Sequence, residues 1–218
     1  MKKLPRLYLP FDIEEDFLIP ASLDNTHYLL DVMRTNSCLV FNKGSEFLAI
    51  LVEKNKKYYF SILEKTTHQD PSNEISLYFA PVKRIDELVN IATQLGVSRL
   101  CPVITDRTVI KNINFDRLKK ISIEASEQSG RNSIPLILET IPFKNLNKSN
   151  LSYADERKLI SSEKNLKINS NNLLIGPEGG FSENEFSILD NSGAIGFSLG
   201  KTILRSEIAT AVAISKFL

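Results

Sequence analysis

The sequence predicts an α/β domain with a mostly parallel sheet, preceded by a small β-rich domain. From residue 75 onward, short apolar runs alternate with segments of helical periodicity, which is typical of parallel sheets. Before residue 66, short runs of β-branched and aromatic residues are separated by polar turns. The polar stretch TTHQDPSNE, residues 66–74, separates the two patterns. We therefore expect two domains, at 1–70 and 71–218.

Composition supports a globular chain and excludes several classes of site. The 218 residues are 42% hydrophobic and 24% charged, which is ample for a core, and the net charge of +1 argues neither for nor against nucleic acid. Prolines interrupt the N-terminal MKKLPRLYLPFD, and no apolar run approaches about twenty residues, so we expect a cytoplasmic protein without a membrane segment. Two cysteines and two histidines lack metal-ligand spacing, so no metal site is expected.

The first domain is expected to contain three strands, which suggest a small barrel or sandwich. They are CLVFN at 38–42, EFLAILVE at 46–53 and KKYYFSILE at 56–64.

In the second domain, five strands and four helices are expected, one of which follows the first glycine-rich loop described below. The strands lie at 74–82, 99–104, 134–141, 172–176 and 194–200. Helical spacing predicts helices over 84–97 and 113–130, which stop at Gly96 and Gly130. A third, buried helix should form the tail TILRSEIATAVAISKFL. One of its faces carries Ile208, Ala211, Val212 and Ser215, and we expect that face to be buried.

Two glycine-rich loops follow predicted strands. In LLIGPEGGFSENEF, residues 173–186, the glycines permit a tight turn and close backbone approach to a ligand. Ser182 and Glu185 have the spacing of a capping box, which places a helix directly behind the loop. Ligands bind beyond the carboxyl ends of parallel strands, although a plain strand–turn–helix connection explains the same residues.

The second loop, GFSLGKT at 196–202, resembles a phosphate-binding loop but is one residue too short between its glycines. A nucleoside triphosphatase is therefore not expected. Arg205 and Glu207 start the terminal helix, close to whatever the two loops bind.

The segments IGPEGGFSENE, LGKTILRSEIA and IEASEQSGR together resemble the RsmE-type 16S ribosomal RNA uridine N3-methyltransferases of the SPOUT superfamily. The similarity extends over the whole chain, including PRLYLP, HYLLDVMR and LGVSRLCPVITDRTV. It implies a PUA-like β-barrel for RNA at 1–70 and a SPOUT domain at 71–218 whose chain forms a trefoil knot. It also implies S-adenosyl-L-methionine as cofactor, a homodimer, and small-subunit ribosomal RNA within the assembled 30S particle as substrate.

The resemblance also implies site residues. The expected cofactor-binding residues are Ile175, Gly176, Pro177, Gly179, Gly180, Leu199, Gly200, Ile203, Leu204 and Ala209. Arg205 is the candidate to stabilise charge on the deprotonated uracil, or it forms an ion pair with Glu207. Glu178 is a candidate general base, or it binds loop backbone. The candidate RNA contacts are Arg6, Arg34, Glu124, Gln128 and Arg131.

Some segments depart from the family pattern. Ile91 and Gln94 stand where a Lys and a Glu are usual, the first domain is shortened after Arg34, and residues 153–156, in the third cofactor loop, differ from the common sequence. Two alternatives remain: a catalytically idle RNA-binding homologue, and a SPOUT enzyme that modifies a ribose 2′-hydroxyl or a tRNA base.

Overall fold

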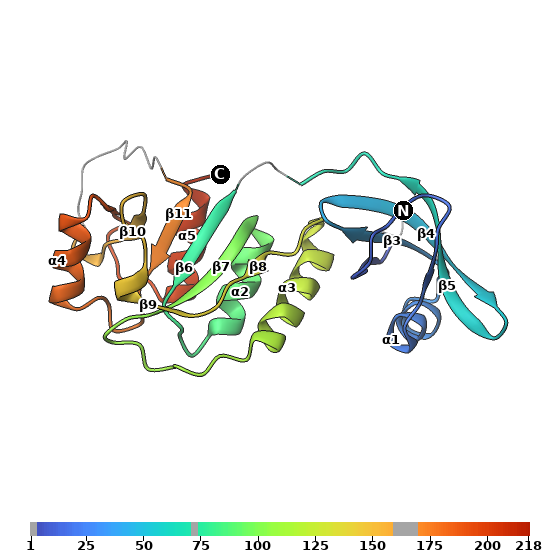
Figure 1. Cartoon of the computed structure of the whole chain (residues 1–218), viewed down its shortest axis with the longest axis horizontal. Coiled ribbons are helices and arrows are strands. Elements are labelled where there is room, and N and C mark those ends of the chain that lie inside the picture. The colour runs from blue at the N-terminus through green and yellow to red at the C-terminus, as the bar shows by residue number, and fades with distance from the viewer. Residues whose placement is uncertain (1–3, 71–73, 159–169) are drawn as a thin grey trace. The chain divides into compact units, whose positions relative to one another are not determined.

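The computed structural model describes residues 4–70, 74–158 and 170–218, which form two compact units (Figure 1). The first unit comprises Met1–Pro71 and Ser126–Ile134, and the second comprises Ser72–Ala125 and Pro135–Leu218. The sequence did not indicate that a segment from the middle of the chain completes the first unit.

A five-stranded sheet forms the first unit, with the order β1-β3-β4-β5-β2. Its strands are β1 (Arg6–Tyr8), β2 (Leu18–Pro20), β3 (Ser37–Asn42), β4 (Ser45–Lys54) and β5 (Lys57–Lys65). The three predicted strands are β3, β4 and β5. The β1–β3 pair is parallel and the other pairs are antiparallel. Within the described part of the chain, the outer strands β1 and β2 do not pair with each other, so closure into a barrel stays a prediction.

Between β2 and β3 the chain forms two short helical segments, α1 (Leu23–His27) and the π-helical η1 (Tyr28–Met33). The Ser22 hydroxyl caps α1 by accepting a hydrogen bond from the Asn25 N–H at 3.1 Å. Leu29 of η1 is fully buried in the core of this unit, together with β-strand residues such as Val40 and Phe60.

The second unit contains a sheet in which every pair of strands is parallel, which confirms the predicted fold class. Its strands are β6 (Ile75–Phe79), β7 (Val97–Ile104), β8 (Leu136–Ile137), β9 (Ile141–Pro142), β10 (Ser152–Ala154), β11 (Asn172–Ile175) and β12 (Ile195–Phe197). Their order is β12-β10-β11-β6-β7-β8, and β9 also pairs with β7. The sequence did not indicate β10.

The single strand expected at 134–141 is instead two short strands. β8 pairs with Arg99 and Leu100 of β7, and β9 pairs with Val103 and Ile104. The interruption falls opposite Cys101 and Pro102, and proline has no N–H to donate to a ladder.

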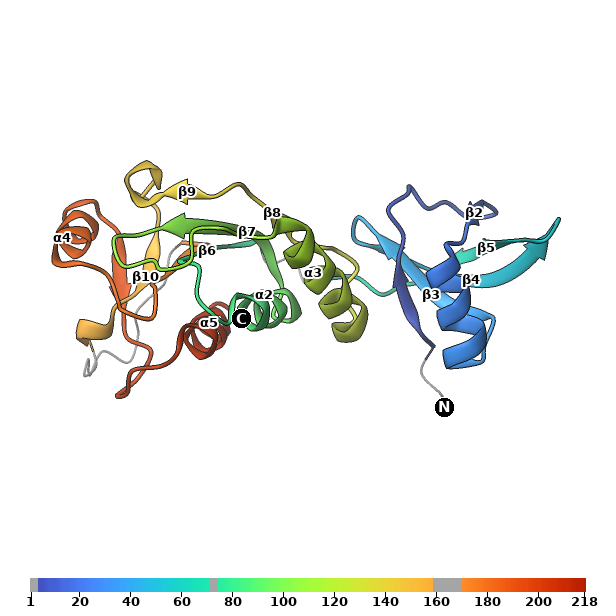
Figure 2. The same cartoon turned by 90° about the horizontal axis from the view of Figure 1, so that it is seen from below.

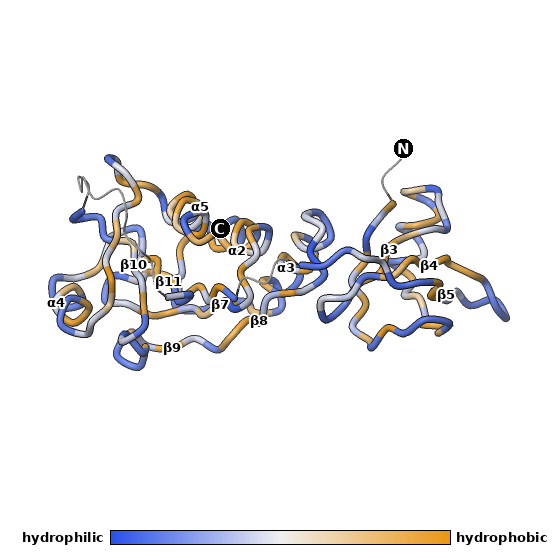
Figure 3. The backbone as a smooth tube through the Cα atoms, turned by 90° about the horizontal axis from the view of Figure 1, so that it is seen from above, coloured by the Kyte–Doolittle hydropathy of each residue, from blue (hydrophilic) through white to orange (hydrophobic). Residues whose placement is uncertain are grey.

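Helices lie on both faces of this sheet. They are α2 (Ile85–Gln94), α3 (Phe115–Ser129), α4 (Glu183–Asn191) and α5 (Ser206–Ser215), with the 3-10 turns η2 (Phe143–Asn145) and η3 (Glu156–Lys158). Strand β11 shows why both faces are covered: Leu173 and Ile175 pack with α2 and α5, whereas Leu174 packs with α4 and η2. Figure 2 shows α2 and α5 on the same side of the sheet. Figure 3 shows hydrophobic residues concentrated in the strands and in α5.

The predicted buried face of the terminal helix is wrong. Ile208 is 45% exposed, and the buried face instead carries Ala209, Thr210, Ala213 and Ile214. Both faces of α5 are apolar, so periodicity alone could not choose between them. In the folded protein, α5 packs against α2 through the face that carries Ala209, Ala213 and Ile214. Within the described part of the chain, no helix is long and apolar enough to cross a membrane.

Candidate active site

A cavity of about 730 Å³ lies in the second unit, at the carboxyl ends of β6, β10, β11 and β12. This is the edge of a parallel sheet at which ligands bind. The residues that line it are Lys83, Arg84, Ala154, Asp155, Glu156, Ile175, Gly176, Pro177, Glu178, Gly179, Gly180, Ser198, Leu199, Gly200, Thr202, Ile203, Leu204, Arg205, Ser206 and Ala209. All ten expected cofactor-binding residues are among them, as are Glu178 and Arg205.

The first glycine loop is held from several sides. Gly180 has a left-handed φ of 69°, and its N–H donates to the Pro177 carbonyl at 2.9 Å. Arg107 Nη1 donates to the Gly179 carbonyl at 2.8 Å, and the Ser206 hydroxyl donates to the Gly176 carbonyl at 3.3 Å. A Cβ on Gly180 would overlap the Glu156 carboxylate, so a larger residue does not fit without displacing Glu156.

Directly behind this loop, the capping box predicted for α4 is confirmed. The Ser182 hydroxyl accepts from the Glu185 N–H at 3.2 Å, and the Glu185 carboxylate accepts from the Ser182 N–H at 2.9 Å. Its other oxygen accepts from the Asp106 N–H at 2.9 Å. Glu185 is buried, so these hydrogen bonds fix the point at which the loop enters the helix.

A third segment, residues 154–156, forms another wall of the cavity. It comprises the end of β10 and the first residues after it. The family resemblance placed residues 153–156 in a third cofactor loop, whereas periodicity did not indicate the strand before it, which is only three residues long. Asp155 is buried, and Glu156 lies against Gly180. A Cβ on Gly196 would lie 2.8 Å from both the Tyr153 hydroxyl and the Asp155 carboxylate. Strand β12 therefore passes directly over this segment before it enters the second glycine loop.

Arg84, which lines the cavity, forms ion pairs with two acids. Arg84 Nη1 lies 3.0 Å from a Glu87 carboxylate oxygen, and its Nε lies 3.8 Å from the Glu207 carboxylate. The pKa of Arg84 is raised, first by Glu87 and then by Glu207 and Glu178. Sequence reasoning missed Arg84, because an arginine at the start of a helix carries no distinguishing signal.

The alternative of an Arg205–Glu207 ion pair is wrong for the described structure. Glu207 is buried and its ion pair is with Arg84, whereas Arg205 is exposed at the N-cap of α5. Arg205 is the N-cap, with extended backbone, and Glu207 lies two positions further along, where residues of a helix do not face each other, so the two side chains leave the start of α5 in different directions.

The first unit requires one correction among the candidate RNA contacts. Arg6 is buried, and its guanidinium donates to Glu46 at 2.7 Å, to Asn132 at 2.5 Å and to two backbone carbonyls. It also lies over the Phe41 ring at 4.7 Å. These internal contacts use its donors, so Arg6 is a structural residue and not a phosphate contact.

The other candidates fall into two groups. Arg131 is buried; burial lowers its pKa, an effect that Asp70 opposes, with 4.0 Å between Arg131 Nε and Asp70 Oδ2. Arg34, Glu124 and Gln128 are exposed, and the last two lie four residues apart on α3.

Comparisons with known proteins identify the family. A family model described as an RNA methyltransferase domain matches residues 68–218. The ribosomal RNA small subunit methyltransferase E of Rickettsia conorii is 31% identical, with 98% of this chain and 95% of that protein covered. The protein of the same name from Mesomycoplasma hyopneumoniae is 29% identical, with 93% and 94% covered.

Solved structures of proteins with the same or a related name have the same fold as this chain. A ribosomal RNA small subunit methyltransferase E from Neisseria gonorrhoeae, crystallised with S-adenosyl methionine, superposes with a TM-score of 0.85 at 28% identity, with 98% of this chain and 96% of that chain covered. A probable rRNA-methyltransferase from Porphyromonas gingivalis gives 0.81 at 26% identity, with 98% and 97% covered. With its sequence and fold matched over nearly their full length, the chain belongs to the RNA methyltransferase family of the ribosomal RNA small subunit methyltransferase E proteins.

Proposed function

We propose that this protein transfers a methyl group from S-adenosyl-L-methionine to N3 of a uridine in small-subunit ribosomal RNA. One observation carries the proposal: the two glycine loops that the family resemblance assigns to the cofactor line a single cavity at the carboxyl edge of a parallel sheet. The Neisseria relative with the same fold was crystallised with this cofactor.

The residues present fit S-adenosyl-L-methionine. The volume of about 730 Å³ is within the range of small-molecule sites. Ile175, Leu199, Leu204 and Ala209 provide an apolar surface suited to an adenine ring. The glycine loops bring backbone hydrogen-bonding groups to the cavity, and at Gly180 the first loop lies directly against the Glu156 carboxylate.

The cofactor supplies a methyl group already activated on a sulfonium, so the protein must position the base and manage its proton. Uracil N3 carries a proton and becomes nucleophilic when that proton leaves. Arg205 lines the cavity and is exposed, so its guanidinium is available to stabilise the negative charge of the deprotonated base. Glu178, on the first glycine loop, is the candidate to accept the proton. Glu207 is not among the residues that line the cavity, and it acts through its ion pair with Arg84.

The two units have separate tasks in this proposal. Residues 1–70 form a PUA-like barrel that binds RNA, supported by the five-stranded sheet and the exposed Arg34. Residues 71–218 form the SPOUT domain with a trefoil knot, supported by the close approach of Gly196 to Tyr153 and of Gly180 to Glu156. Glu124 and Gln128 are the remaining RNA candidates on α3. The substrate is the 16S RNA of assembled 30S particles, which places the protein in the cytoplasm.

We expect a homodimer with the site near the subunit interface. Ile208 on α5 is 45% exposed, and Ile203 in the second glycine loop is 78% exposed. Ala211 and Val212 extend this apolar surface along α5. Exposed apolar surface beside a cavity is typical of a protein interface, and cyclic dimers are the commonest oligomers.

The test has two parts. Calorimetry should show that the protein binds S-adenosyl-L-methionine. Labelled methyl transfer to 30S particles from cells lacking the protein, followed by mass mapping of nucleosides, should then yield N3-methyluridine. A 2′-O-methylated nucleoside, or methylation of tRNA only, would replace the proposal with another SPOUT target. Cofactor binding or RNA binding without any methyl transfer would indicate an idle homologue.

A further inference from the structure

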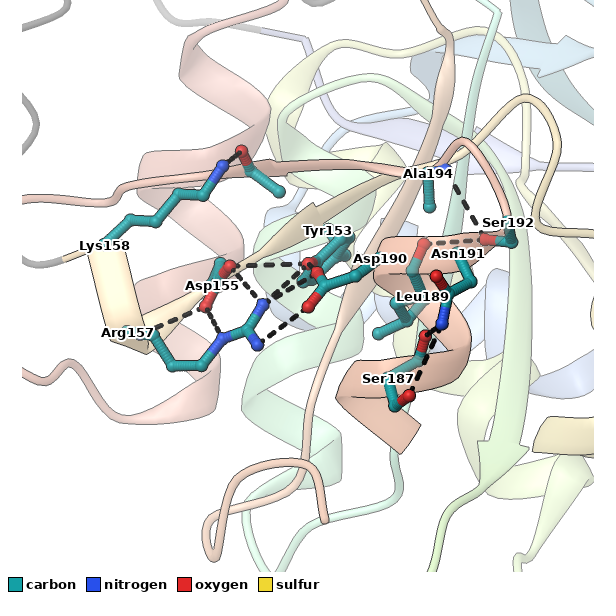
Figure 4. Close-up of polar contacts among 11 residues, drawn as sticks. Tyr153, Asp155, Arg157, Lys158, Ser187, Leu189, Asp190, Asn191, Ser192 and Ala194 are labelled. Carbon is teal, nitrogen blue, oxygen red and sulfur yellow. Dashed lines mark hydrogen bonds and ion pairs between the residues drawn. The ribbon is translucent and has the colours of Figure 1, made fainter. Parts of the chain in front are cut away.

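Behind the wall formed by residues 154–156 lies a dense polar network, which we call the Arg157 clamp: Tyr153, Asp155, Arg157 and Asp190 (Figure 4). Arg157 Nε donates to Asp155 Oδ1 and its Nη2 donates to Asp155 Oδ2, both at 2.9 Å. The same guanidinium donates to the two oxygens of Asp190 at 3.0 and 2.9 Å. Arg157 therefore joins a buried carboxylate at the cavity to a carboxylate on α4.

Further contacts make the clamp rigid. The Tyr153 hydroxyl donates to Asp190 at 2.8 Å and accepts from Arg157 Nη2 at 3.1 Å. The guanidinium lies over the Phe186 ring at 3.9 Å. Bidentate contacts between arginine and carboxylates hold a fixed geometry, and stacking on an aromatic ring restricts the guanidinium plane. The Asp155 side chain is fully buried, so its two oxygens depend on these donors.

The clamp immediately flanks Glu156, which has a different environment. Glu156 lines the cavity, and its carboxylate lies against Gly180. No hydrogen bond or ion pair of its side chain occurs among the described residues. Its two neighbours in sequence, Asp155 and Arg157, are fixed by the clamp, and Lys158 is held by a 2.9 Å hydrogen bond from Nζ to the Gly196 carbonyl. Glu156 therefore carries an acceptor without a partner among the described residues, on a segment that the clamp holds in place.

From this arrangement, and resting on the proposed function, we infer that Glu156 is a cofactor-binding residue whose carboxylate accepts hydrogen bonds from the ammonium or ribose hydroxyl groups of S-adenosyl-L-methionine, and that Arg157 positions it. A carboxylate in a cavity interacts favourably with such donors, and charge-assisted hydrogen bonds are the strong class. Arg157 itself lines no part of the cavity, so its effect on binding is transmitted through Asp155 and the backbone of the turn η3.

The experiment is calorimetric titration of the full-length protein and its variants with S-adenosyl-L-methionine and with S-adenosylhomocysteine, well below the melting temperature of each variant. Removing a hydrogen bond to a charged group should raise the Kd of Glu156→Ala and of Arg157→Ala by about tenfold or more. The loss should be similar for both ligands, because both carry the same ammonium and hydroxyl groups. Asp190→Asn, outside the cavity, should raise the Kd less.

The double variant Glu156→Ala/Arg157→Ala separates positioning from general stability. If Arg157 acts through Glu156, the double variant binds no more weakly than the worse single variant. Two matched controls should bind normally: Arg117→Ala, which breaks the exposed ion pair with Asp86, and Glu139→Ala, an exposed acid outside the cavity. If Arg157→Ala does not fold, the Kd values of Asp190→Asn and Glu156→Gln are compared with that of the wild type instead.

An unchanged Kd for folded Glu156→Ala, or additive losses in the double variant, would overturn this inference while leaving the proposed function intact. Failure of the wild-type protein to bind S-adenosyl-L-methionine at all would instead overturn the proposed function, and the inference with it.

Discussion

Replacing Gly180 with alanine tests the geometry of the first glycine loop, and Gly193 provides a matched control. Both residues have a left-handed φ, 69° at Gly180 and 81° at Gly193. A residue with a Cβ in this conformation costs about 1–2 kcal/mol. At Gly193 a Cβ would meet nothing within 4 Å, whereas at Gly180 it would overlap the Glu156 carboxylate. Both alanine substitutions therefore strain the backbone, whereas only the substitution at Gly180 also creates a steric overlap.

The two variants should differ in binding more than in stability. The shared cost of about 1–2 kcal/mol corresponds to a fall in Tm of roughly 2–8 °C for a chain of this size. The Glu156 carboxylate is the end of a flexible side chain, so it can move away from the new Cβ. That movement removes it from its place in the cavity, so Gly180→Ala should bind S-adenosyl-L-methionine about tenfold more weakly. Gly193→Ala should bind it normally.

Scanning fluorimetry without ligand measures the first effect, and isothermal titration at 15–20 °C measures the second. Wild-type affinity in a folded Gly180→Ala protein would refute the reasoning that the Glu156 carboxylate, placed against Gly180, contributes to cofactor binding. An equal loss of affinity in Gly193→Ala would show that the weakening is a general consequence of lower stability.

Three further predictions concern charge and assembly. Arg205→Ala should bind cofactor nearly normally and melt close to the wild type, yet lose about 10²–10³ in single-turnover methylation rate, with poor rescue by lysine; a normal rate would end its catalytic role. Arg157, and then Tyr153, lower the pKa of Asp190 from 3.8 to about 2, so its charged form stabilises the fold above pH 3.8 and this contribution is lost as the pH falls towards 2. The urea midpoint of Asp190→Asn should therefore lie below that of the wild type at pH 6, and the gap should narrow at pH 3; an equal gap at both pH values would contradict the ion pair. Ile208→Glu should shift light-scattering mass from dimer to monomer and reduce methylation, and an unchanged dimer would remove α5 from the interface.

Much of the second unit could be predicted because its signals are local. The helix over 84–97 was visible from its periodicity and its terminal Gly96, and Gly96 has the positive φ of 93° that favours glycine. The capping box at Ser182 and Glu185 depends on two residues three positions apart, so the start of α4 was also visible. The two glycine loops that line the cavity were also visible, because backbone conformations that only glycine adopts easily require glycine at those positions.

The clamp and the ion pairs could not be predicted in this way. Tyr153, Asp155 and Arg157 alternate along a three-residue strand and the turn after it, a pattern too short to distinguish from a polar loop. Their partner Asp190 is 33 residues from Arg157, and no local rule links the two. Likewise, Arg6 was predicted to contact RNA from the surface of the first domain. It is buried because residues 126–132 belong to the first unit and accept its hydrogen bonds.

The sequence by itself therefore determined the fold class, the family and the backbone of the two loops, because periodicity, capping and glycine act over a few neighbouring residues. The tertiary structure alone decided which face of α5 is buried and which acid pairs with which arginine: Glu207 with Arg84, and Asp155 and Asp190 with Arg157. Ion pairing depends on distance in space, and exposed and buried positions differ by the desolvation that each charge undergoes. Neither the distance between two charges in space nor their desolvation can be derived from a short stretch of sequence.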